Sequence, residues 1–98
     1  MSKVDILFVP DKVQEMVRRT CFDQKCEPVL VTKRTTVEDD YLNLYLVVGR
    51  QYEPKNVEKS YNLWTYDAET MDFHEDFKDK SSLEVFEELN RRLYSFKN

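Results

Sequence analysis

The chain has 98 residues, of which 41% are hydrophobic, 35% charged and 13% aromatic, and its net charge is −4 at neutral pH. This length and balance predict a single globular domain over residues 1–98 and exclude a disordered chain, which would be poor in aromatic and aliphatic residues. No apolar run in the sequence approaches the roughly 20 residues of a membrane-spanning helix.

Glycine, cysteine and histidine are scarce, which narrows the chemistry that the chain can support. Gly49 is the only glycine, whereas phosphate-binding loops need several glycines so that the backbone can approach the anion. Cys21 and Cys26 have a poor spacing for zinc, and His74 is the only histidine. No signal-peptide cleavage site follows the first apolar stretch. We therefore expect free thiols in a reducing cytoplasm, with no metal and no cofactor.

The N-terminal part of the chain predicts a strand followed by a helix. Val4–Val9 is mostly apolar, and Pro10 ends the strand because proline has no amide hydrogen for the ladder. Asp11 and Gln14 have the spacing of a helix capping box. The predicted helix runs to about Thr20, with apolar side chains every three or four residues: Val13, Met16 and Val17.

Four more strands follow, separated by polar segments. They are predicted over Val29–Lys33, Tyr41–Val48, Ser60–Tyr66 and Met71–Glu75. The second of them has the clearest alternation, and its aliphatic set is expected to face the core: Leu42, Leu44, Leu46 and Val48. The connections are short, and Asp67–Thr70 resembles a hairpin turn. Short connections predict an antiparallel meander, since parallel pairs need longer ones.

The C-terminal part predicts a second helix. Ser81 and Glu84 form another capping-box spacing, and an apolar stripe follows: Leu83, Phe86, Leu89, Leu93 and Phe96. The complete order is β-α-β-β-β-β-α. We expect an α+β domain with a mainly antiparallel sheet of four to five strands, and both helices packed on one of its faces.

Aromatic side chains are the first candidate binding feature. If the leucines of the second meander strand face the core, the alternate side chains face solvent, and cross-strand pairing collects an aromatic group there. This predicted partner-binding face consists of Tyr41, Tyr45, Trp64 and Tyr66. Aromatic residues are enriched at protein interfaces. The alternative is that they cover the sheet and pack only on one another.

Acidic turns are the second candidate. The meander places two acidic segments at the same end of the sheet, comprising Glu38, Asp39, Asp40, Asp67 and Glu69. Such a cluster could bind a basic partner or imitate the phosphates of a nucleic acid. The alternative is ordinary solvated turn chemistry.

Catalysis and nucleic-acid binding have weaker support. His74 lies beside acidic residues that could orient its ring, but the sequence gives no sign that it meets a cysteine. We therefore predict that the chain is not an enzyme. Three basic pairs near a predicted aromatic face could assist stacking on single-stranded RNA, although the acidic turns would repel phosphates: Arg18–Arg19, Lys33–Arg34 and Arg91–Arg92.

The sequence favours a small cytoplasmic protein-binding module that acts as a regulator, an inhibitor or an accessory subunit. Its partner is expected to be another protein rather than a membrane or a nucleic acid. The alternatives are a nucleic-acid mimic that blocks a DNA-binding enzyme and a single-stranded nucleic-acid binder. An edge strand, either Val4–Val9 or Met71–Glu75, could also pair across a two-fold axis and form a homodimer.

Overall fold

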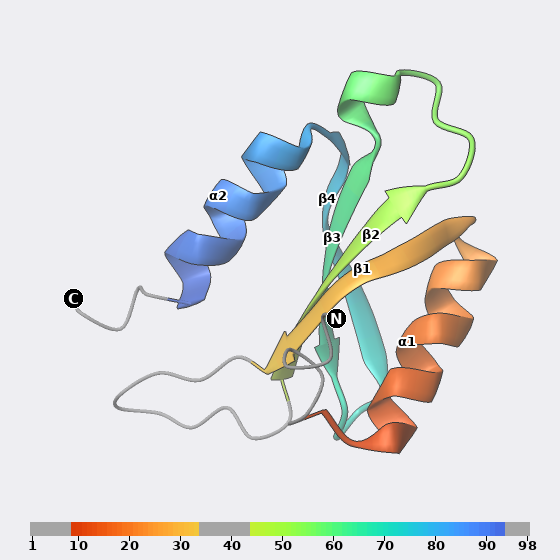
Figure 1. The fold of residues 1–98 in the computed structure, drawn as a ribbon. Coiled ribbons are helices and arrows are strands. Elements are labelled where there is room, and N and C mark those ends of the chain that lie inside the picture. Colours follow the sequence, from red (N-terminus) through yellow and green to blue (C-terminus); the bar gives the residue numbers. More distant parts are fainter. Residues whose placement is uncertain (1–8, 34–43, 94–98) are drawn as a thin grey trace.

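The computed structural model describes residues 9–33 and 44–93, which form two helices and an antiparallel sheet (Figure 1). The elements in chain order are α1 (Asp11–Asp23), β1 (Cys26–Lys33), β2 (Leu44–Gln51), the short 3-10 helix η2 (Val57–Lys59), β3 (Tyr61–Asp67), β4 (Asp72–Lys80) and α2 (Ser82–Leu93). The α+β class and the antiparallel arrangement are confirmed. The predicted first strand lies outside the described residues except for Val9, which is 4% exposed and belongs to the core.

The four strands pair in sequence order, β1-β2-β3-β4. In the central pair, Val47 lies opposite Trp64 and Leu46 lies opposite Thr65. The edge pairings are less regular, with one register shift near Pro28 in the β1–β2 pair and two within the β3–β4 pair. These shifts let a strand bend without breaking the sheet.

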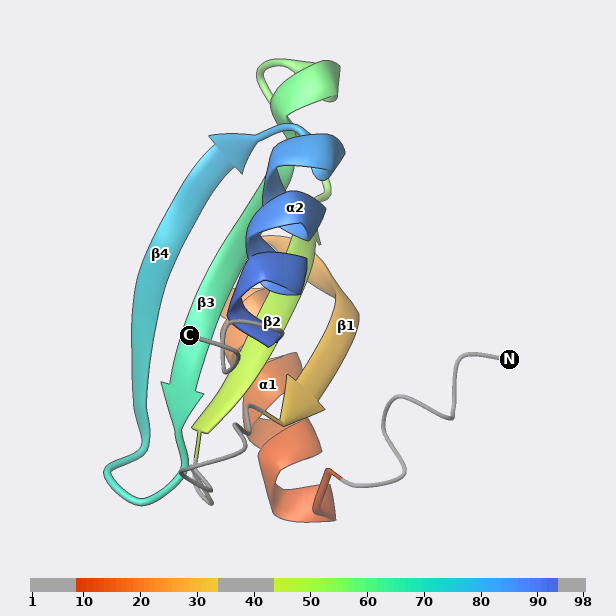
Figure 2. The same cartoon turned by 90° about the vertical axis from the view of Figure 1, so that its left-hand side faces the viewer.

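The helices cover opposite faces of the sheet, so the predicted packing of both on one face is wrong (Figures 1 and 2). The reason lies in β2, which is apolar on both sides. Tyr45 and Val47 pack beneath α1, whereas Leu46 and Val48 pack beneath α2. A strand that is apolar on both faces needs cover on both, because either face left bare would expose it to water.

Helix α1 lies on the sheet through three side chains spaced four residues apart: Val13, Val17 and Cys21. The predicted capping box at its start is not formed, because residue 10 is proline and the helix has no side-chain cap. The Gln14 side chain instead donates to the Val9 carbonyl oxygen at 2.9 Å. Val9 is thereby held at the entrance to the helix.

Helix α2 begins at a true capping box. The Glu84 amide donates to Ser81 Oγ at 3.1 Å, and Glu84 Oε1 accepts from the Ser81 amide at 3.1 Å. Val85 and Leu89 are the buried side chains of α2, and they pack against the aliphatic face of the sheet. Phe86, Leu89 and Leu93 of the predicted stripe belong to the core on this face or pack against it, whereas Leu83 is 66% exposed. Phe96 lies outside the described residues. Neither α1 nor α2 is long and apolar enough to cross a membrane.

Candidate binding surfaces on the α1 side of the sheet

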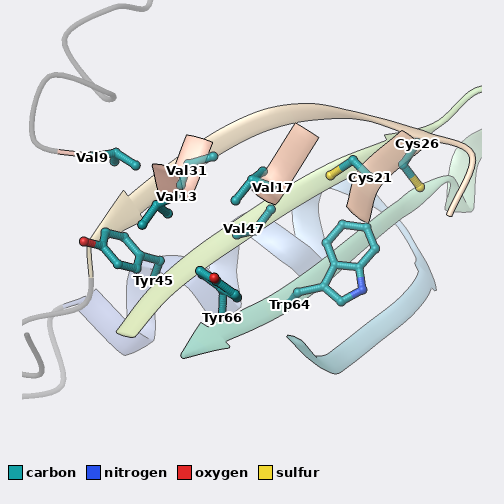
Figure 3. Close-up of a cluster of buried hydrophobic side chains, with 10 residues drawn as sticks. All are labelled: Val9, Val13, Val17, Cys21, Cys26, Val31, Tyr45, Val47, Trp64 and Tyr66. Carbon is teal, nitrogen blue, oxygen red and sulfur yellow. The ribbon is translucent and has the colours of Figure 1, made fainter. Parts of the chain in front are cut away.

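The predicted aromatic face does not point to solvent. Tyr45, Trp64 and Tyr66 are only 4%, 3% and 2% exposed, since α1 covers the face that we expected to be free. Figure 3 shows all three rings on one side of the sheet with the α1 residues above them. Tyr41, the fourth predicted member, lies outside the described residues. An open aromatic sheet face is therefore excluded for the three described residues.

Trp64 has a structural role that explains the single glycine. Its indole ring lies against β2 at Gly49, and a Cβ atom added at Gly49 would come within 2.6 Å of Trp64 Cζ3. Real Cβ atoms do not approach a ring this closely, so only glycine leaves room for the indole. Gly49 and Trp64 are thus a packing pair in the core beneath α1.

The two tyrosines differ from Trp64 because they border an open groove. A hollow of about 540 Å³ separates α1 from the β3–β4 turn. We call it the α1 groove, and its lining consists of Pro10, Lys12, Val13, Glu15, Met16, Arg19, Tyr45, Tyr66, Ala68 and Met71. Most of these side chains are apolar, and Met71 at the turn is 60% exposed. The groove is within the size range of ligand pockets.

The floor of the α1 groove carries two phenol hydroxyls. Tyr45 and Tyr66 are direct cross-strand neighbours, and Phe73 stacks on Tyr66 with 4.3 Å between ring centroids. Neither hydroxyl makes a hydrogen bond to another side chain or backbone group of the described residues. Burial raises the pKa of Tyr66, and the nearby Asp67 carboxylate and Tyr45 add to this shift. Tyr66 therefore remains protonated at neutral pH and can donate a hydrogen bond.

The mouth of the α1 groove is charged. Lys12 and Arg19 contribute two cations, and Glu15 contributes one anion. The Glu15 and Arg19 side chains approach to 3.4 Å, but each is 64% exposed, so this ion pair is weak and easily rearranged. The charges that line the groove therefore have a positive excess, in contrast to the negative whole chain.

A second hollow, of about 440 Å³, lies at the C-terminal end of α1. Phe22 and Tyr52 stand beside it and are 72% and 55% exposed. We call this surface the Phe22–Tyr52 patch, and its lining consists of Glu15, Arg18, Arg19, Phe22, Cys26, Pro28 and Tyr52. This patch could not be predicted from the sequence pattern, because Phe22 and Tyr52 lie outside every predicted strand and helix. The sequence feature that could have indicated the patch is the presence of large aromatic residues in segments predicted as loops.

The acidic end is only partly described. Asp67 is the first residue of the β3–β4 turn, and its Oδ1 accepts from the Glu69 amide at 2.9 Å and from the Thr70 amide at 3.4 Å. Its carboxylate therefore closes the turn. Glu69 is exposed, while Glu38, Asp39 and Asp40 lie outside the described residues. The gathering of five carboxylates stays a prediction.

His74 belongs to the opposite face of the sheet from the cysteines. It pairs across strands with Thr65, and its Nε2 lies 3.4 Å from Asp76 Oδ1. Asp76 is already engaged, since Thr65 Oγ1 donates to it at 2.6 Å and Arg92 binds it at 2.9 Å. The imidazole is 78% exposed. This arrangement fits an ion-pair network that fastens α2 to β4.

The two thiols are buried in the core beneath α1 (Figure 3). Burial, with a contribution from Cys26, raises the pKa of Cys21 to about 12, and burial also raises the pKa of Cys26. Both therefore stay protonated and weakly nucleophilic at neutral pH. Within the described ranges, no group of three or more histidine, cysteine or acidic side chains could hold a metal ion.

No protein-family model matches this chain, and neither the curated proteins nor the solved structures compared with it show significant similarity. The α1 groove and the Phe22–Tyr52 patch are therefore the features from which a function can be inferred.

Proposed function

We propose that the chain is a small protein-binding module, acting as a regulator, an inhibitor or an accessory subunit, and that the Phe22–Tyr52 patch is its contact surface. The observation that carries this proposal is the exposure of two aromatic side chains, 72% for Phe22 and 55% for Tyr52, around one shallow hollow. Large aromatic residues bury much apolar area when a partner covers them, and they dominate many interface energies.

The patch is also well positioned to bind. Phe22 follows Cys21, whose side chain is fully buried, and so it projects from a helix turn that the core holds in place. The Tyr52 amide donates to the Lys25 carbonyl oxygen at 3.0 Å, which ties the start of the β2–β3 connection to the end of the α1–β1 turn. Anchored side chains lose less conformational entropy on binding.

Arginine side chains set the chemistry of the expected partner. Arg18 and Arg19 are exposed and line the same hollow as the two aromatic rings. Arginine is enriched with aromatic residues at interfaces and pairs well with carboxylates. We therefore expect a partner surface that combines an apolar or aromatic side chain with acidic groups.

The test compares the wild-type chain with the double variant Phe22→Ala/Tyr52→Ala. Proteins captured from native lysate by the wild-type chain are identified, purified and titrated against both forms by calorimetry. We expect the double variant to lose at least about a hundredfold in affinity, because two hot-spot side chains are removed.

The matched control is Leu83→Ala, which truncates an apolar side chain of similar exposure (66%) on the α2 side. It should bind as the wild-type chain does. A purified partner that binds all three forms equally would refute the patch as the contact surface.

A further inference from the structure

The α1 groove contains an unusual combination of burial and unused hydrogen-bonding capacity. Tyr45 and Tyr66 are at least 96% buried, yet within the described part of the chain neither hydroxyl has a hydrogen-bond partner. Buried tyrosine hydroxyls normally find one, because leaving a polar group unpaired in the interior is costly. Both side chains line the same hollow, so a ligand bound there would lie beside both.

The walls of the groove favour an apolar ligand body. Val13 and Met16 of α1 face Ala68 and Met71 of the β3–β4 turn across the hollow. Methionine side chains are flexible and adapt their shape to a bound apolar group. A volume of about 540 Å³ accommodates a molecule considerably larger than a simple ion.

The polar groups favour an acceptor with negative charge. The two phenols offer donors at the floor, while Lys12 and Arg19 stand at the mouth with only Glu15 opposing them. Glu15 lies 3.4 Å from Arg19 and is the only acid among the described residues that line the groove, so Lys12 is the second cation available to an anionic ligand. Hydrogen bonds to an ionised acceptor are stronger than those to a neutral one.

From these features we propose that the α1 groove binds a small amphipathic carboxylate, with its apolar tail between α1 and the β3–β4 turn and its carboxylate on the Tyr45 and Tyr66 hydroxyls. This site is separate from the Phe22–Tyr52 patch, so it adds a small-molecule ligand to the proposed protein-binding role. The groove and the patch adjoin, because both are lined by the Glu15 and Arg19 side chains, but their aromatic residues differ.

The test uses sodium decanoate, below its micellar concentration, as the probe for the full-length chain. Two matched probes separate the contributions of the carboxylate and of the alkyl chain to binding. Butyrate keeps the carboxylate but has only a short alkyl chain, and decyltrimethylammonium keeps the ten-carbon chain but carries a positive charge. Amide chemical shifts should move saturably with decanoate for groove residues, including Met16, Ala68 and Met71. Both control probes should bind at least about tenfold more weakly.

Two variants then probe the floor. Tyr45→Phe and Tyr66→Phe remove only an oxygen and keep the ring, so each should retain the fold, which near-ultraviolet circular dichroism of Trp64 checks. Each should weaken decanoate binding about tenfold, as expected for a lost hydrogen bond to a charged group. Phe22→Ala should leave decanoate binding unchanged, which separates this test from that of the proposed function.

A variant at the mouth keeps the test decisive even if a tyrosine variant misfolds. Met71→Glu alters an exposed side chain and puts a negative charge beside the ligand, and it should abolish decanoate binding. Leu83→Glu makes the same change at similar exposure on the other side of the sheet and should not affect it. The proposal is overturned if decanoate causes no saturable shift, if decyltrimethylammonium binds as tightly, or if Met71→Glu binds as the wild-type chain does.

Discussion

The cores on the two faces of the sheet differ in their side chains. Beneath α2 the core is aliphatic, with Leu46, Val48 and Leu63 fully buried, and an ion-pair network closes its margin. Beneath α1 the core combines valines with three aromatic rings and two thiols, and it opens into the α1 groove and the Phe22–Tyr52 patch. We infer that the α2 face mainly supports stability and that the α1 face carries recognition.

The largest effect should come from truncating the α2 face. Leu63→Ala removes a fully buried side chain from the centre of the sheet and should lower the free energy of unfolding by about 3 kcal/mol. Tyr66→Phe, on the other face of the same strand, should not lower the free energy of unfolding, because the hydroxyl that it removes has no partner within the described residues. Urea denaturation of both variants measures this contrast, and equal losses would contradict it.

The ion-pair network should have the next largest effect. Arg92 binds Asp76 at 2.9 Å and Glu88 at 2.7 Å, and all three side chains are less than one-fifth exposed. Arg92→Met would leave the largely buried Asp76 carboxylate without its arginine, while Glu88 would keep its contact with Arg91. We expect a loss of about 2 kcal/mol in unfolding free energy. The double variant Arg92→Met/Asp76→Asn should recover part of this loss in the same denaturation experiment. If it recovers none, the two residues are not coupled.

Substitution of the single glycine tests packing on the α1 face. Gly49→Ala would place a methyl group 2.6 Å from Trp64 Cζ3, and the ring must move. We expect a loss of roughly 1–2 kcal/mol, with a changed near-ultraviolet circular dichroism signal from Trp64. Trp64→Phe should be less sensitive to the same glycine substitution, because the smaller ring leaves room. An unchanged Trp64 signal in Gly49→Ala would mean that the indole does not lie against the strand.

The smallest expected effect is the decrease in unfolding free energy at acidic pH. Hydrogen bonds from Ser81 lower the pKa of Glu84 below its ordinary value of 4.5, and hydrogen bonds from Arg91 and Arg92 lower that of Glu88. A carboxylate with a depressed folded-state pKa stabilises the fold above its unfolded pKa, and the contribution is lost as the pH falls through the folded pKa. Unfolding free energy should therefore decline below about pH 4.5. Glu84→Gln should make the decline shallower in denaturation curves recorded from pH 6 to 3.

Local features of the fold could be predicted from the sequence. The alternation around Leu46 located the central strand, and Ser81 with Glu84 located the start of α2, because each signal depends on near neighbours in the chain. Strand β4 was predicted too short, ending at Glu75 instead of Lys80. Its two register shifts interrupt the period of two, and its many charges hide the apolar pattern.

The candidate surfaces could not be predicted in the same way. Alternation in β2 shows that the strand has an apolar set of side chains on each face. It does not tell which helix covers which face, since the same residues are buried whichever helix covers them. Tyr45 and Tyr66 were therefore placed on a free face, whereas they form the floor beneath α1. The α1 groove joins Met16 to Met71, residues far apart in sequence that only tertiary packing brings together.

The register shifts have a further consequence for sheet growth. An added strand needs a continuous row of free backbone groups, and edge irregularities are a common defence against unwanted aggregation. In β1 the register is constant over Cys26–Pro28 and again over Leu30–Lys33, and in β4 it is constant over Asp72–Glu75. The longest uniform stretch of either edge strand is therefore four residues. Edge-to-edge association of two copies would therefore be confined to a very short ladder, and stacking of sheets into fibrils would begin from a poor template.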